Sequence, residues 1–149
     1  MSLLVGDVFR HGAEVTPHLL AGSLGDDAIT FAELDAASNR VANHLAAAGV
    51  APGARLAWQD ETSLDALALF AGAAKAGVTF MPISPRFSEA ETAQVLALAR
   101  PDHFVTDIAP LLDGPDTDAH LDAELPERSR HVVFFTSGST GRPKGVVLS

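Results

Sequence analysis

The sequence predicts an α/β fold, in which a mainly parallel sheet carries helices packed on it. Strand-like apolar runs alternate with helix-length segments, and this order of elements builds parallel sheets. Serine or threonine followed three residues later by glutamate marks two helix starts. Hydrophobic residues make up 47% of the 149-residue chain and charged residues 19%, which is typical of a globular domain with a core of its own.

The first fifty residues are expected to form two helices separated by a short hairpin. Pro17 ends the first helix, because proline cannot continue a helical hydrogen-bond ladder. Thr30 and Glu33 form a capping box that starts the second helix, and Gly49 ends it. The first helix is expected over 2–16, and the hairpin strands over 18–22 and 28–30.

Strand and helix alternate regularly over the next fifty residues. Ser63 can cap one helix, and Ser88 with Glu91 forms a second capping box. This alternation implies parallel strands joined by crossover helices. Strands are expected over 55–58, 78–81 and 103–106, with helices from 63 to about 76 and from 88 to just before Pro101.

Residues 107–130 interrupt this alternation. The segment contains Gly114-Pro115, Pro126 and seven carboxylates, so we expect a solvated connection with about one helical turn. A metal site is the alternative for these acids, but exposed acidic connections are the usual case. The carboxylates are those of Asp107, Asp113, Asp116, Asp118, Asp122, Glu124 and Glu127.

The overall charge and the absence of cysteine narrow the classes of function. A net charge of −9 and a pI near 4.9 argue against a surface for nucleic acid or anionic membranes. The chain has no cysteine, so we expect a reducing compartment and a cytoplasmic protein. No apolar window is long enough for a membrane span, and no signal peptide is evident.

The last nineteen residues, HVVFFTSGSTGRPKGVVLS, hold the strongest functional signal. An apolar run over 131–135 predicts a strand with both faces buried, and 145–148 resumes strand-like composition. Between them, glycines let backbone N–H groups turn inward beside hydroxyl groups, which makes an anion cradle. Lys144 adds a positive charge where the loop ends. The loop residues in question are Thr136, Ser137, Gly138, Ser139, Thr140 and Gly141.

This loop differs from the helix-opening phosphate loop of Walker type, because Pro143 precedes Lys144 and a strand follows. An ordinary polar hairpin loop is the plain alternative. A ten-residue run, Thr136-Ser-Gly-Ser-Thr-Gly-Arg-Pro-Lys-Gly145, is far more specific than a short glycine-rich match. It closely resembles the phosphate-binding signature of the adenylate-forming (AMP-binding) enzymes, among which the chain looks most like an acyl-CoA synthetase.

The resemblance extends along nearly the whole chain in the order of that family. It includes Thr30-Phe-Ala-Glu-Leu34, Gly49-Val-Ala-Pro-Gly53, Lys75-Ala-Gly77 and Met81-Pro-Ile-Ser-Pro-Arg86. Ser84 departs from the pattern, since such enzymes generally have Asn or Asp there. The resemblance implies that residues 1–149 are the N-terminal portion of the large AMP-binding domain. The acid pocket, the magnesium-binding Glu, the ribose-binding Asp and the small C-terminal domain are then expected to lie outside this chain.

The resemblance implies ATP-dependent activation of a carboxylic acid to an acyl-adenylate, followed by transfer to coenzyme A. The loop would hold the ATP phosphates through Thr136, Ser137, Gly138, Ser139, Thr140, Gly141 and Lys144. Thr136 would also approach Mg²⁺. No residue of the chain is assigned a catalytic role or a role in recognising the acid.

A second hypothesis comes from a different class of protein. The chain could be a non-catalytic binding or assembly module derived from the same fold. Its final strand would then present an open sheet edge and an uncovered apolar face, and both features favour self-association.

We expect the 149-residue piece by itself to form no adenylate, because the resemblance places the acid pocket and the adenylating lysine elsewhere. Pyrophosphate release is the measurement. Release above background with any carboxylic acid would contradict this expectation.

Overall fold

The computed structural model describes residues 4–119, 125–126, 128–136 and 141–149, and it confirms the α/β prediction. Within these ranges, no helix combines the length and the apolar composition needed to cross a membrane. The elements in chain order are α1 (Val5–Val15), β1 (Leu20–Leu24), β2 (Asp27–Thr30), α2 (Phe31–Ala47), β3 (Arg55–Trp58), α3 (Leu64–Lys75), β4 (Thr79–Pro82), α4 (Glu89–Ala99), β5 (His103–Val105), the 3₁₀ helix η1 (Ala109–Asp113), β6 (Val132–Thr136) and β7 (Lys144–Leu148).

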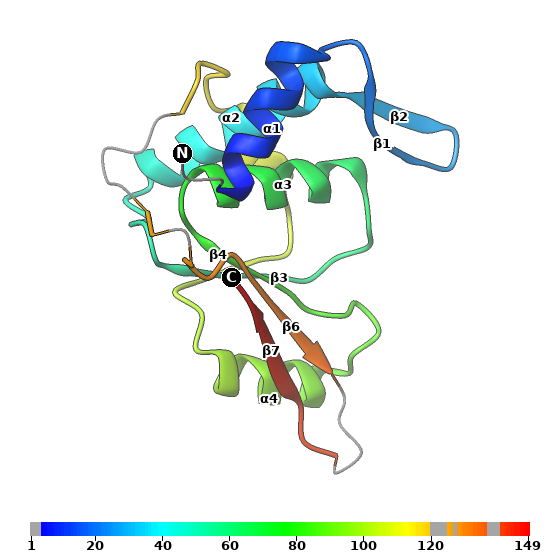
Figure 1. Ribbon diagram of the computed structural model, residues 1–149. Helices are drawn as coiled ribbons and strands as arrows, with labels where there is room; N and C mark the ends of the chain where they lie inside the picture. The colour runs from blue at the N-terminus through cyan, green and yellow to red at the C-terminus, as the bar shows by residue number, and fades with distance from the viewer. Residues whose placement is uncertain (1–3, 120–124, 127, 137–140) are drawn as a thin grey trace.

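The described strands form one five-stranded sheet and one separate hairpin (Figure 1). The large sheet has the order β5-β3-β4-β6-β7. Its first four strands are parallel, while β7 returns antiparallel to β6. The hairpin β1–β2 turns at Gly25, whose φ of 61° lies in the left-handed region that glycine adopts without strain.

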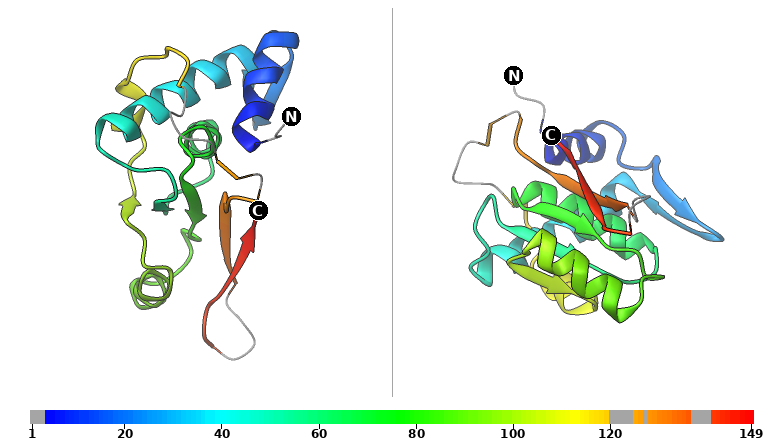
Figure 2. Two further views of the ribbon diagram at one scale, coloured as in Figure 1. Left: turned by 60° about the vertical axis from the view of Figure 1, so that its left-hand side comes forward. Right: turned by 90° about the horizontal axis from the view of Figure 1, so that it is seen from below.

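Helices cover both faces of the central strands (Figures 1 and 2). The helices α1, α2 and α3 lie on one side, and α4 lies on the other. Alternate side chains of a strand point to opposite faces, so Leu56 and Trp58 join the cluster formed with α2 and α3. Ala57 between them joins Met81, Val95 and neighbours in the smaller cluster under α4. Both faces of β3 and β4 are therefore buried, as expected for parallel strands.

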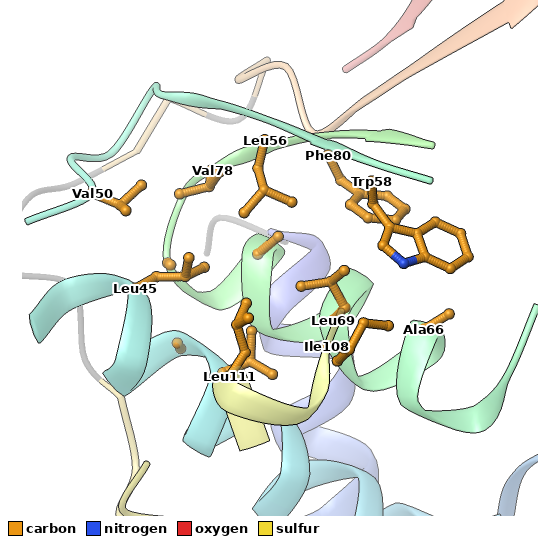
Figure 3. Close-up of a cluster of buried hydrophobic side chains, with 14 residues drawn as sticks. Leu45, Val50, Leu56, Trp58, Ala66, Leu69, Val78, Phe80, Ile108 and Leu111 are labelled. Atoms are coloured by element: carbon orange, nitrogen blue, oxygen red, sulfur yellow. The ribbon is translucent and has the colours of Figure 1, made fainter. Parts of the chain in front are cut away.

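Figure 3 shows the larger of these clusters, where Trp58 stacks on Phe80 with ring centroids 6.0 Å apart. Ile108 and Leu111 also enter this cluster, and both are buried. The expectation that 107–130 is a solvated connection is therefore wrong for its first part, where η1 supplies the expected helical turn. The physical reason is that η1 places two aliphatic side chains against the core, which composition alone did not indicate.

Backbone carbonyls fasten the segment after η1 to the first two helices. Asn43 donates from Nδ2 to the carbonyls of Pro115 and Thr117, both at 2.8 Å. Arg10 donates to the carbonyl of Ala119 at 2.6 Å. These side chains hydrogen-bond backbone carbonyl groups that would be paired within the segment if it were a helix or a strand. The segment is therefore held in place although it has no regular secondary structure.

Lys75 is a fully buried cation at the end of α3. Its Nζ donates to Asp35 Oδ1 at 2.5 Å and to Asn39 Oδ1 at 2.8 Å, both on α2. Burial lowers the pKa of the Lys75 ammonium, and the hydrogen bond and charge of Asp35 oppose that shift. The side chain of Asp35 keeps 26% of its surface exposed, so the pair is only partly shielded from water. These contacts join α2 to α3 through charge as well as apolar packing.

The strand β6 departs from the prediction that both its faces are buried. Val132 and Val133 are buried, but Phe134 is 47% exposed, and every residue of β7 is exposed. The cause is topological, because β6 pairs with β4 only at Val132 and Phe80, and then continues as a two-stranded ribbon with β7. Figure 2 shows this ribbon extending away from the other strands.

Replacing Lys75 by methionine should lower the free energy of unfolding by about 2–4 kcal/mol. This is near the lower end of the usual effect of breaking a buried ion pair, because Asp35 still reaches water. Lys144→Met is the matched control, since these are the two lysines of the chain and Lys144 is exposed. Urea unfolding of both variants is the measurement. Equal stability of the two would contradict the role given to Lys75.

The two capping boxes should make stability fall in acid. Hydrogen bonds from Thr30 and Ser88 lower the pKa of Glu33 and Glu91 below the ordinary 4.5. The unfolded chain then binds more protons than the folded chain as the pH drops past about 4.5. The stabilisation is therefore complete above that pH and is lost as the pH falls through the lower, folded-state values.

Replacing both box glutamates by glutamine should flatten the fall of the melting temperature below pH 4.5. Melting curves between pH 3 and pH 7, on the order of half a unit apart, would measure this. The double variant Glu14→Gln, Glu61→Gln is the control, because these exposed glutamates lie outside the boxes. The same acid profile in wild type and box variant would show that the boxes do not contribute.

Candidate functional site

The candidate site lies where the ribbon β6–β7 opens into its loop. Thr136 is the last residue of β6, Lys144 is the first of β7, and the two are direct partners in the register of the ribbon. Directly opposed residues point to the same face, with Cβ atoms about 4.5–5.5 Å apart. The ribbon therefore places the side chains of Thr136 and Lys144 on the same face, and both residues are exposed.

The loop itself is described only from its exit onward. Gly141 has a φ of 72°, and an added Cβ would meet no atom within 4 Å. Glycine is thus required at position 141 by the positive φ, and not by a lack of space for a side chain. Ser137, Gly138, Ser139 and Thr140 lie outside the described residues, so the cradle expected from them stays a prediction.

The charge of this region is opposite to that of the chain as a whole. The last nineteen residues contain no Asp or Glu, while Arg142 and Lys144 are both exposed. The complete sequence carries a formal charge of −9. A local excess of positive charge beside the exposed hydroxyl of Thr136 favours binding of an anion over a cation.

Gly145 fixes the ribbon just beyond Lys144. It is the register partner of Phe135. A Cβ at this position would lie 3.3 Å from Val133 Cγ1 and 3.4 Å from Phe135 Cε1, so the aromatic ring lies against the bare glycine backbone. An alanine there would require Val133 to shift by a few tenths of an ångström, next to the register pair Thr136 and Lys144.

A hollow that sequence reasoning did not assign lies at the carboxyl ends of β3 and β4. It has a volume of about 460 Å³ and includes Gln59, Pro85 and Phe87 in its lining. Here α3 and α4 leave toward opposite faces, and open α/β sheets commonly bind ligands at such a point. The sequence favours a plain strand-to-helix turn over 82–86, with Pro82 and Pro85 lining a site as the alternative, and Pro85 does line this hollow. The hollow could be located only from the strand order, which is known once the pairing of the strands is known.

Side-chain hydrogen bonds cross this hollow. Gln59 donates from Nε2 to the carbonyl of Ser84 and to Thr92 Oγ1, both at 2.9 Å. In the described parts of the chain, no three acidic, histidine or cysteine side chains are grouped as a metal would need.

These features define a class of protein: an α/β domain whose last two strands, β6 and β7, form a ribbon joined through the ten-residue motif Thr136–Gly145. The chain belongs to the family of AMP-binding enzymes, whose model matches residues 9–131. The matched segment ends at His131, before the ribbon and its loop.

The relatives are longer proteins of the adenylate-forming type. The chain is 30% identical to tyrocidine synthase 2 of Brevibacillus parabrevis over 95% of its own length and 4% of that protein. It is 35% identical to the feruloyl-CoA synthase of an Amycolatopsis species, over 92% of this chain and 31% of that one. A solved fatty acyl CoA synthetase from Mycobacterium tuberculosis superposes with a TM-score of 0.84 at 25% identity, over 98% of this chain and 34% of the synthetase.

Proposed function

We propose that residues 1–149 are the N-terminal portion of the large domain of an ATP-dependent, adenylate-forming enzyme. One observation carries this proposal: Thr136 and Lys144 face each other at the mouth of the ribbon, on a chain of the AMP-binding family. The chain spans about a third or less of the relatives named above, so the activity is proposed for the whole protein.

The proposed reaction is the transfer of AMP to a carboxylic acid. A carboxylate oxygen attacks the α-phosphorus of ATP and forms a new P–O bond. The bond from that phosphorus to the oxygen bridging to the β-phosphate breaks, and its electron pair leaves with pyrophosphate. The products are an acyl-adenylate and pyrophosphate.

In this proposal, the loop binds the leaving group. Thr136, Ser137, Gly138, Ser139, Thr140 and Gly141 would provide hydroxyl and backbone N–H donors to the β- and γ-phosphates. Each charge-assisted hydrogen bond is worth about 1.5–3 kcal/mol. Lys144 would offset the charge that develops on pyrophosphate, which lowers the barrier only if the contact strengthens in the transition state.

Magnesium would arrive with ATP in this proposal. Mg²⁺ is commonly coordinated by substrate phosphate oxygens, by water molecules that it retains and by only a few protein ligands. The exposed hydroxyl of Thr136 fits a single oxygen contact of this kind. The ion would supply charge neutralisation at the phosphates, and further protein ligands would come from the rest of the protein.

We propose coenzyme A as the second substrate, whose thiol would displace AMP from the acyl-adenylate. The similarity to a feruloyl-CoA synthase supports this choice. The similarity to tyrocidine synthase 2 favours a different acceptor, so the acceptor must be identified by assay. The second candidate function, a non-catalytic assembly module, is favoured by the exposed apolar side chains of β7.

In the protein that carries the complete domain, Lys144→Ala should slow ATP–pyrophosphate exchange by about 10²-fold, the usual effect of removing one charge-stabilising donor. Its free energy of unfolding should change by no more than about 0.5 kcal/mol, because the side chain is exposed. Arg128→Ala, at another exposed basic residue, is the control.

Unchanged exchange together with a lower melting temperature would show that Lys144 is structural. Absence of exchange from the wild-type protein with every acid tested would favour the assembly module.

A further inference from the structure

The exit of the loop lies close to the N-terminal half of α4. A small cavity of about 30 Å³ separates the two, with Phe87, Glu91, Gln94 and Val95 on the helix side. Gly141 and Pro143 form the other wall. Since a single water needs at least about 10–15 Å³ of such volume, the cavity has room for only one or two water molecules.

The helix side of this gap is firmly anchored. Val95 is fully buried and shares a core cluster with Val133 of β6, and Phe87 packs against the same cluster. The capping box fixes the first turn of the helix, because Ser88 N donates to the Glu91 carboxylate at 2.7 Å. The wall that faces the loop exit therefore belongs to the rigid part of the domain.

The loop side determines the direction of Lys144. Pro143 directly precedes Lys144 and has its own φ fixed by the ring. Lys144 then enters the register opposite Thr136. A proline that keeps its place across this small cavity from α4 would leave Lys144 little freedom in where its backbone points. Lys144 itself is exposed.

We propose that Phe87 is a positioning residue for phosphate binding: its ring forms the cavity wall opposite Pro143, limits where the loop exit can move and thereby aims Lys144 at the polyphosphate of ATP. This inference rests on the function proposed above and adds a residue outside the loop to the binding machinery. The same ring also lines the hollow at the carboxyl ends of β3 and β4, so it lies between that hollow and the loop exit.

The test is a double-mutant cycle in the protein that carries the complete domain, measured by ATP–pyrophosphate exchange. Phe87→Ala and Pro143→Ala should each raise the KM for ATP about fivefold with little change in kcat, and the double variant should be no worse than either single one. Phe87→Leu should restore most of the affinity. Leu98→Ala is the matched control on α4, because Leu98 is 55% exposed and lines neither the gap nor the hollow.

If the two residues act independently, their effects multiply, and the double variant raises the KM for ATP about 25-fold. That result would overturn the proposal. A normal KM in Phe87→Ala beside slow exchange in Lys144→Ala would overturn the support role and leave the proposed function standing. Normal exchange in Lys144→Ala would overturn both. Pro143→Ala keeps the cycle informative if Phe87→Ala is poorly folded, because Pro143 lies in the loop and not in the core.

Discussion

The parallel pairing of β3 with β4 is the constraint on which the rest of the domain depends. Both strands are buried on both faces, and their alternating side chains divide the interior into two clusters. That division decides that α3 covers one face and α4 the other. The same divergence opens the hollow at the strand ends and brings α4 beneath the ribbon β6–β7.

The ribbon combines a rigid base with an exposed end. A single register pair, Phe80 with Val132, attaches β6 to the sheet, and Val133 and Phe135 pack toward α4. Beyond these contacts the strands are exposed, so the position of Lys144 depends on its cross-strand pairing with Thr136. The proposed polyphosphate site would be open to solvent at such a place, with Gly145 and the neighbouring helix close to it.

Much of the fold could be predicted because its signals are local. Capping at Thr30, Ser63 and Ser88 correctly located three helix starts. The exposure of Phe134 and the core position of Ile108 were harder, because both depend on which elements lie nearby. The burial of Lys75 was missed altogether, since its partner Asp35 is 40 residues away and a lone lysine normally indicates a surface position.

The sequence by itself determined the order of strands and helices, the helix caps and the ten-residue loop motif, because these rest on periodicity and on residues close together in the chain. Only the tertiary structure decided that Thr136 faces Lys144, that α4 approaches Pro143, and that β3 and β4 lie at the centre of the sheet. Those relations depend on pairing and packing between distant segments, and a linear pattern of residue types does not encode a register or a strand order.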